Sequence, residues 1–146
     1  ERMNLLYLDQ NFYGSIYRRN SASVHLFFGL TQSAVFYRYF SEGGDGSFVG
    51  YHYDELDGTN VGYLRVENLF HWNNFLSFLA VFNTGKTWED SFNINPGKNL
   101  TTGFGLGFRI NTIIGPFRYL YSISPDHQIQ YFNFGFTLST QHEKRR

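Results

Sequence analysis

Residues 103–124, GFGLGFRINTIIGPFRYLYSIS, repeat with a period of two, and this repeat is the feature that most restricts the fold. In the first half of the segment, one set of alternate positions is apolar and the other is small or polar. The apolar set is Phe104, Leu106, Phe108 and Ile110, and the other set is Gly103, Gly105, Gly107, Arg109 and Asn111. Successive side chains of a β-strand point to opposite faces. The segment therefore predicts a strand with two unlike faces.

The same alternation recurs along the chain. In QIQYFNFGFTLST (128–140), every second residue from Phe132 is apolar, and the residues between are small or polar. PFRYLYSIS, VGYLRVENLF and SVHLFFGLTQS repeat the pattern, LLYLDQNFYGSIYRR adds a further strand, and the facing of NFLSFLAVFNTG is ambiguous. Stretches rich in Gly, Asn, Asp and Ser, such as FSEGGDGSF and DELDGTN, separate these segments. The sequence predicts an all-β antiparallel meander of six or seven strands.

Two kinds of barrel fit such a meander. A soluble ligand-binding barrel would turn its aromatic face inward, whereas a transmembrane barrel turns that face to lipid. Aromatic residues make up 21% of the chain and charged residues 16%, and these apolar faces would overfill a small barrel. We therefore favour a segment of about six strands from an outer-membrane β-barrel. A closed single-chain barrel of this type has at least eight strands, and an open edge cannot lie in lipid, so the remaining strands must come from the same protein or another chain.

Composition and motifs exclude several functions. The formal net charge is zero, which gives no electrostatic reason to expect nucleic acid as a partner. There is no cysteine, and the five histidines are scattered without metal-ligand spacing. No Gly-x-Ser-x-Gly nucleophile elbow is present, and GFGLGF opens no helix. We therefore expect no enzyme activity, metal or cofactor in this chain. Its first residues lack a signal-peptide pattern, so we expect a mature chain or a fragment.

From Phe36 onward, the order of motifs resembles the outer-membrane insertase superfamily, the BamA-like barrels of the bacterial surface antigen type. The motifs are FYRYFSEGGDGSFVGY, then VENLF, then AVFNTGKTW in place of Phe-x-Asp-x-Gly, and then GFGLGFRINTIIGPFRYLYS. The resemblance implies an inward loop at about residues 41–60 that folds into the barrel. Its expected residues are Gly43, Gly44, Ser47, Val49, Gly50 and Tyr51.

Two positions depart from the family pattern. In the family, a loop arginine meets the acidic residue of Phe-x-Asp-x-Gly, but here those positions are Val49 and Asn83. Losing one partner alone would leave a buried charge, whereas losing both together can be nearly neutral. We therefore expect a loop that still folds inward but is no insertase lock. In this respect the chain is most similar to the C-terminal barrels of bacterial patatin-like phospholipases.

Further residues are expected on the inner wall and at the end of the barrel. The lumen-facing set is Arg65, Glu67, Asn83, Gly103, Gly105, Gly107 and Arg109. We give even weight to two roles for the three glycines: they admit the loop, or they relieve crowding and let the strand coil. For the charged residues, we favour an internal salt-bridge network over a transport function. NFGFTL resembles the C-terminal insertion signal of outer-membrane barrels, with Asn133, Gly135 and Leu138 as its positions.

These observations predict a domain over residues 1–140 and a basic tail over 141–146. We expect a segment of the bacterial outer membrane that anchors or positions an upstream domain, on the resemblance a patatin-like hydrolase. Its expected partners are outer-membrane lipid, the barrel-assembly machinery during insertion, and the remaining strands. The alternatives are a stand-alone small outer-membrane barrel with a structural, adhesive or translocation role, and a soluble ligand-binding barrel.

Overall fold

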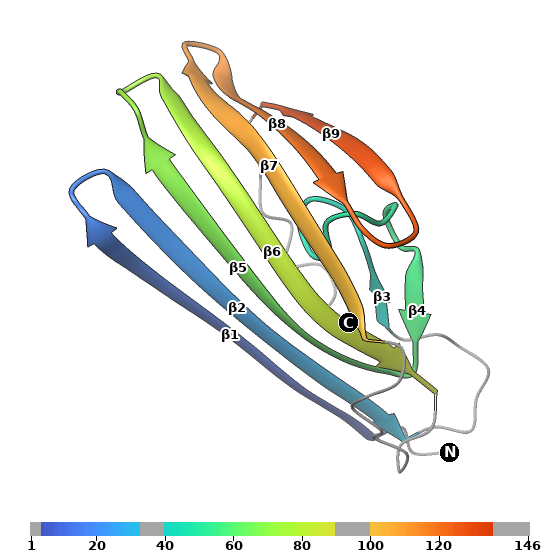
Figure 1. The fold of residues 1–146 in the computed structure, drawn as a ribbon. Coiled ribbons are helices and arrows are strands. Elements are labelled where there is room, and N and C mark those ends of the chain that lie inside the picture. The colour runs from blue at the N-terminus through green and yellow to red at the C-terminus, as the bar shows by residue number, and fades with distance from the viewer. Residues whose placement is uncertain (1–3, 33–39, 90–99, 136–146) are drawn as a thin grey trace.

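A computed structural model describes residues 4–32, 40–89 and 100–135 of this chain as an antiparallel meander. Seven strands form one sheet in the order β1-β2-β5-β6-β7-β8-β9, as Figure 1 shows. Their bounds are β1 Asn4–Tyr17, β2 Asn20–Gln32, β5 Asn60–His71, β6 Leu76–Trp88, β7 Thr101–Thr112, β8 Gly115–Ile123 and β9 Gln128–Phe134. The predicted all-β meander of six or seven strands is confirmed, with seven strands in its sheet. No helix in these ranges is long and apolar enough to cross a membrane.

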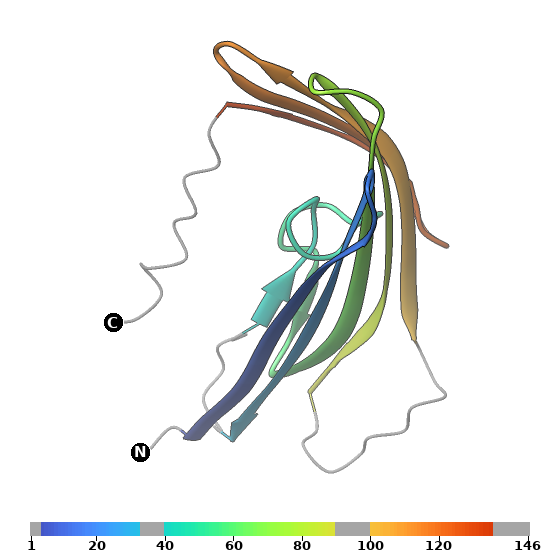
Figure 2. The ribbon, with the colours of Figure 1, turned by 90° about the vertical axis from the view of Figure 1, so that its left-hand side faces the viewer.

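A second, two-stranded sheet interrupts the meander between β2 and β5. Its strands are β3 (Phe40–Glu42) and β4 (Leu56–Gly58), which pair antiparallel. The large sheet is curved, and the β3–β4 hairpin lies on its concave side (Figure 2). We call this concave side the inner face and the convex side the outer face.

The connections at the two ends of the sheet differ in length. At the upper end in Figure 1, β1–β2, β5–β6 and β7–β8 are joined by residues 18–19, 72–75 and 113–114. At the other end, the chain runs through residues 33–59 and 89–100, and through the turn at 124–127. We call the upper end the short-turn end. Outer-membrane barrels have short turns on the periplasmic side and longer loops outside, and two of the three connections at the other end of this sheet are longer in the same way.

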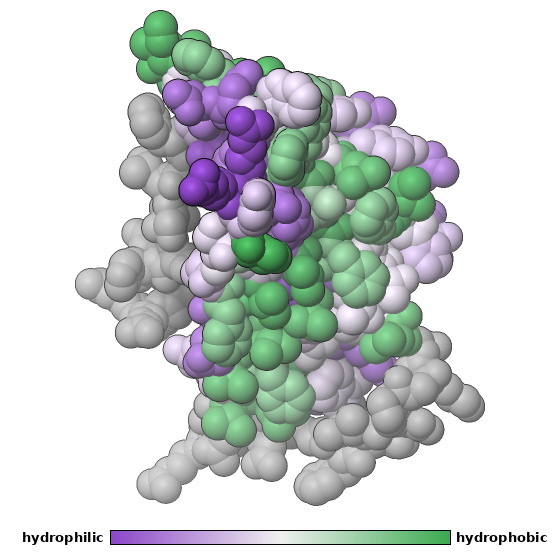
Figure 3. All heavy atoms as spheres, turned by 60° about the vertical axis from the view of Figure 1, so that its left-hand side comes forward, coloured by the Kyte–Doolittle hydropathy of each residue, from purple (hydrophilic) through white to green (hydrophobic). Residues whose placement is uncertain are grey.

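Alternation gives the sheet an apolar outer face, because every second side chain of each strand points outward. The outward residues of β6, β7 and β9 include Phe78, Phe82, Phe104, Leu106 and Phe132, which are 43–65% exposed. Figure 3 shows hydrophobic residues gathered in one broad area below a group of hydrophilic ones. The ambiguous segment 74–85 is resolved, since Ser77, Leu79 and Val81 are buried on the inner side.

The sheet has two edges, β1 and β9, which each pair with one neighbour among the described residues. On β1, the side chains of both faces are exposed: Leu6 is 66% and Leu8 53% exposed on one face, and Tyr7 is 52% and Tyr13 80% exposed on the other. An unpaired edge cannot lie in lipid, because its backbone groups would lack hydrogen-bond partners. Further strands are therefore needed to complete this wall.

Candidate functional site

The β3–β4 hairpin carries a loop, residues 43–55, that lies against the inner face; we call it the inner loop. It is folded tightly on itself, since Gly44 donates its N–H to the carbonyl of Tyr51 at 3.0 Å. Ser47 Oγ accepts from the N–H of Gly43 at 2.9 Å and donates to its carbonyl at 3.0 Å. Gly50 has φ of +88°, and a Cβ there would lie 2.8 Å from the Cβ of Ser124. Only glycine meets both requirements.

The tip of the inner loop is buried in two apolar clusters. Val49 is 0% and Phe48 1% exposed. Val49 packs with Leu79, Val81, Leu120 and Tyr131, and Phe48 and Tyr51 pack with Val61 and Tyr63. The inner face is therefore apolar beneath the loop, where the sequence led us to expect small or polar side chains. That expectation was wrong because the inner loop contributes apolar side chains of its own, and the wall residues that pack against them are apolar too.

Two residues of the wall contact the backbone of the inner loop at Val49. Asn83 on β6, fully buried, accepts the N–H of Val49 on its Oδ1 at 3.0 Å. A Cβ on Gly103 would lie 1.9 Å from the carbonyl oxygen of Val49. Gly103 therefore has the first of the two expected roles, because it admits the loop. The other two glycines do not face the loop: a Cβ on Gly105 would meet the Leu120 side chain, and a Cβ on Gly107 would meet the backbone of Tyr119.

A network of four charged side chains joins the loop to the wall. Asp45, 4% exposed, accepts from Arg118 Nη2 at 2.7 Å. Arg118 also donates to Glu67 through Nη1 at 2.9 Å and Nη2 at 3.1 Å. Arg65 Nη2 lies 2.9 Å from Glu67 and 3.7 Å from Asp45, and its Nη1 donates to the carbonyl of Ser47 at 3.2 Å. Each buried charge thus has opposite charges around it, which offsets the cost of removing it from water.

The network corrects the predicted set of charges. Arg65 and Glu67 belong to it, but Arg109 does not, because its Nε donates to Asn111 Oδ1 at 3.2 Å. Asp45 and Arg118 were missed as functional residues. Arg118 was on the polar face of its strand in the sequence pattern, but nothing in that pattern indicated that a loop aspartate 73 residues away would meet it.

The last strand and the turn before it also hold the loop. Tyr131 on β9 accepts the N–H of Gly50 at 3.1 Å and donates to the carbonyl of Tyr51 at 2.6 Å. Asn133 Nδ2 donates to Asp45 Oδ2 at 2.7 Å. Asn133 and Gly135, predicted as parts of the insertion signal, therefore have folded-state contacts, since Gly135 also donates to Pro116 at 3.2 Å. Leu138 and the 141–146 tail lie outside the described residues.

Two titratable groups of the loop face the β8–β9 turn. Burial raises the pKa of the Tyr51 phenol, and its hydroxyl donates to Asp126 Oδ2 at 3.2 Å. Glu55 Oε1 lies 2.6 Å from His127 Nε2. Burial by itself would raise the pKa of Glu55, but hydrogen bonds from the His52 backbone and the His127 ring outweigh it, and the net pKa is lowered.

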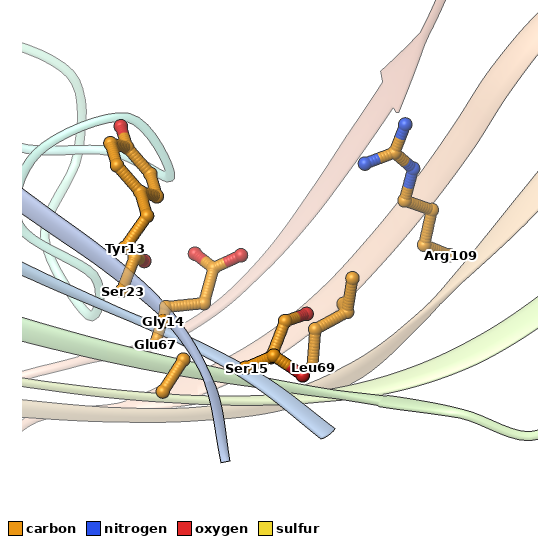
Figure 4. A pocket seen from close by; sticks show the side chains of 9 residues that line it. Tyr13, Gly14, Ser15, Ser23, Glu67, Leu69 and Arg109 are labelled. Carbon is orange, nitrogen blue, oxygen red and sulfur yellow. The ribbon is translucent and has the colours of Figure 1, made fainter. Parts of the chain in front are cut away.

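A hollow remains beside the loop on the inner face, toward the short-turn end. Its volume is about 470 Å³. Figure 4 shows Tyr13, Glu67 and Arg109 rising into it from β1, β5 and β7. Across residues 4–32, 40–89 and 100–135, no three His, Cys, Asp or Glu side chains are grouped to hold a metal ion. The main feature of this face is the inner loop, which is bonded to β5, β6, β8 and β9 and fills the space between them.

Comparison with known proteins agrees with this geometry. The family model described as the OMP85 superfamily matches residues 39–138, from the start of the inner-loop hairpin past the end of β9. None of the curated proteins compared with the chain matches it. OMP85 superfamily proteins reside in the bacterial outer membrane. This location excludes the soluble-barrel alternative and fits the apolar outer face. The chain belongs to the OMP85 superfamily and is a β-barrel segment of the bacterial outer membrane.

Proposed function

We propose that this chain anchors an upstream domain in the outer membrane as a plugged barrel wall, with the inner loop as the plug. The observation that carries the proposal is the clamped loop, in which Val49 is 0% and Phe48 1% exposed. A loop held by apolar packing, by Asn83 and by the Asp45 network makes a rigid wall. Such a wall suits a platform better than an open passage.

The upstream domain is, in this proposal, a patatin-like lipid acyl hydrolase. Two features support this choice of domain. The loop motif resembles that of the barrels attached to those enzymes, and Asn83 stands where other members of the superfamily have an aspartate. This chain has no nucleophile elbow, so the hydrolysis would belong entirely to the upstream domain. The open edge at β1 supports further strands before residue 1, because that edge must be paired in lipid. Insertion by the barrel-assembly machinery through Asn133, Gly135 and Leu138 stays a prediction.

The mass of the polypeptide in isolated outer membranes tests the anchoring role. An antibody against the inner loop would detect the band on a denaturing gel, and peptide mass spectrometry would read its upstream sequence. We expect a mass several times the 17.1 kDa of this chain and upstream peptides with a Gly-x-Ser-x-Gly motif. A band at 17.1 kDa would contradict the proposal and support the stand-alone barrel. A larger band without that motif would contradict the hydrolase alone.

Conductance tests the plug. The protein that carries this chain is reconstituted into planar bilayers, beside a variant in which a short Gly-Ser linker replaces residues 44–54. We expect the unaltered protein to conduct little and the variant to open large, steady channels. Equal conductance of the two, or large channels in the unaltered protein, would contradict a plugged lumen.

A further inference from the structure

Arg109 on β7 lies on the inner face near the short-turn end of the sheet. Its guanidinium forms no ion pair in the described part of the chain. Glu67 lines the same hollow, but its carboxylate is already bonded to Arg65 and Arg118. Arg109 also lies directly opposite Arg118 in the β7–β8 register, and like charges at opposite positions repel each other. An anion beside Arg109 would therefore lower the free energy of this arrangement.

The side chain of Arg109 is held in place by its neighbours. Its Nε donates to Asn111 Oδ1 at 3.2 Å. Asn111 is itself fixed to the β5–β6 turn, because its Nδ2 donates to the carbonyl of Asn74 at 3.4 Å and its backbone N–H donates to that of Phe75 at 2.8 Å. The Nη1 and Nη2 groups of Arg109 have no acceptor among the described residues. A guanidinium held in this way offers two parallel donors, the geometry that binds the oxygens of a carboxylate or a phosphate.

Hydroxyl groups line the other part of the hollow, whose volume is about 470 Å³. Tyr13 and Ser23 each bring a hydroxyl that forms no hydrogen bond with another described residue. Ser21 adds a third, which lies 3.1 Å from His71 Nε2. Figure 4 shows the Tyr13 hydroxyl and the Arg109 guanidinium on the same side of the sheet. The hollow therefore offers one unmatched cation together with hydroxyl groups that can donate and accept hydrogen bonds.

The size and the donors of the hollow indicate the class of ligand. Small-molecule sites have volumes of about 300–1,000 Å³, and this hollow lies within that range, so an inorganic ion alone would leave most of it empty. A phosphate group suits the donors better than a carboxylate, because its additional oxygens can accept from hydroxyls while two of them accept from the guanidinium. Hydroxyl groups in the wall suit a ligand that carries hydroxyl groups of its own.

We propose that this hollow is a binding site for a phosphate ester of a small polyhydroxy compound. The phosphate lies on Arg109, and the hydroxyl groups of the ligand bond to Tyr13 and Ser23. Binding leaves the Asp45 network intact, because Glu67 keeps its bonds to both arginines. The site goes beyond the anchoring role and does not depend on the identity of the upstream domain. The same chemical group occurs in soluble glycerol 3-phosphate and in the headgroup of phosphatidylglycerol.

Phosphorus NMR tests the site with the protein that carries this chain, in micelles of dodecyl maltoside, which contains no phosphorus. Glycerol 3-phosphate is titrated, and the broadening of its signal gives the affinity. We expect Arg109→Gln to weaken binding at least about tenfold, because hydrogen bonds to a charged group are lost. The control is Arg18→Gln, an exposed arginine at the same end of the sheet, which should change the affinity less than about twofold. Absence of broadening, unchanged binding in Arg109→Gln or equal losses in both variants would overturn the proposal.

Tyr13→Phe tests the polyhydroxy part of the ligand. Tyr13 is 80% exposed, so loss of its hydroxyl should not disturb the fold, and heat-modifiable migration on gels checks the folding of each variant. We expect this variant to bind glycerol 3-phosphate about three- to tenfold more weakly and inorganic phosphate as the unaltered protein does. Equal affinity of the unaltered protein for these two probes would contradict a polyhydroxy ester.

Competition separates the two sources of the phosphate ester. Binding of radiolabelled glycerol 3-phosphate is measured with the protein in nanodiscs of phosphatidylcholine, with and without phosphatidylglycerol. Loss of binding in the presence of phosphatidylglycerol would assign the site to a lipid headgroup, and unchanged binding would assign it to a soluble ester. Absence of binding in both kinds of nanodisc would contradict the site, since an acidic group of the protein itself would then occupy Arg109.

Discussion

Asp45 on the inner loop and Arg118 on β8 form an ion pair of 2.7 Å between residues 73 positions apart. In the family that the sequence resembles, the loop supplies the arginine and the strand the acid. Here the loop supplies the acid and the strand the arginine, while Asn83 receives only the backbone of Val49. The loop is thus held by an ion pair in which the acidic and basic partners have exchanged places. The absence of the family's own arginine and acid at Val49 and Asn83 gave no indication of this pair.

Removal of the Asp45 carboxylate should loosen the inner loop. In Asp45→Ala, Arg118 and Asn133 lose an acceptor each, and we expect the free energy of unfolding to fall by about 1.5–3 kcal/mol, the range for hydrogen bonds to charged groups. Urea unfolding in lipid vesicles measures it. The matched control is Glu89→Ala, an exposed acid at the far end of the sheet, which should change the value by less than about 0.5 kcal/mol. Equal effects of the two substitutions would contradict a role for the network.

A methyl group at Gly103 should unseat the loop, because its Cβ would lie 1.9 Å from the carbonyl oxygen of Val49. We expect Gly103→Ala to cost about 1–3 kcal/mol, as overpacking does. Backbone hydrogen exchange in residues 43–55 should become faster. Gly14→Ala serves as control, since a Cβ there would have nothing within 4 Å. Unchanged exchange in Gly103→Ala would show that the loop does not depend on this glycine.

Leu120 should matter more than a leucine that faces lipid. Leu120 is 0% exposed beneath Val49, whereas Leu106 on β7 is 53% exposed on the outer face. Leu120→Ala is expected to lower the free energy of unfolding by about 2–5 kcal/mol, since it leaves a cavity. Leu106→Ala should lower it by less, because lipid chains can close around the smaller side chain. The two variants are compared by unfolding in vesicles, and a larger loss in Leu106→Ala would refute the packing argument.

The contact between Glu55 and the β8–β9 turn should weaken in acid. The pKa of Glu55 is lowered from its ordinary value of 4.5, so the folded loop favours the ionised carboxyl. Its stabilising effect is complete above that ordinary pKa and is lost as the pH falls through the folded pKa. Hydrogen exchange of residues 43–55, corrected for the intrinsic rate, should therefore become faster below about pH 4.5. Glu55→Gln should lack this change, and a variant that keeps it would point to another group.

The sequence by itself determined the strands and their two faces, because a period of two needs only the alternation of side chains along one strand. It therefore predicted the meander, the apolar outer face and the inward position of Arg65, Glu67 and Asn83. Tertiary structure decided what those inner residues meet. Asp45, Arg118 and Tyr131 come together only when the inner loop folds back on the sheet. Leu120, an apolar residue among the inward positions of β8, is a core residue because Val49 covers it. Such contacts depend on where a loop lies in space, and local sequence periodicity carries no information about that position.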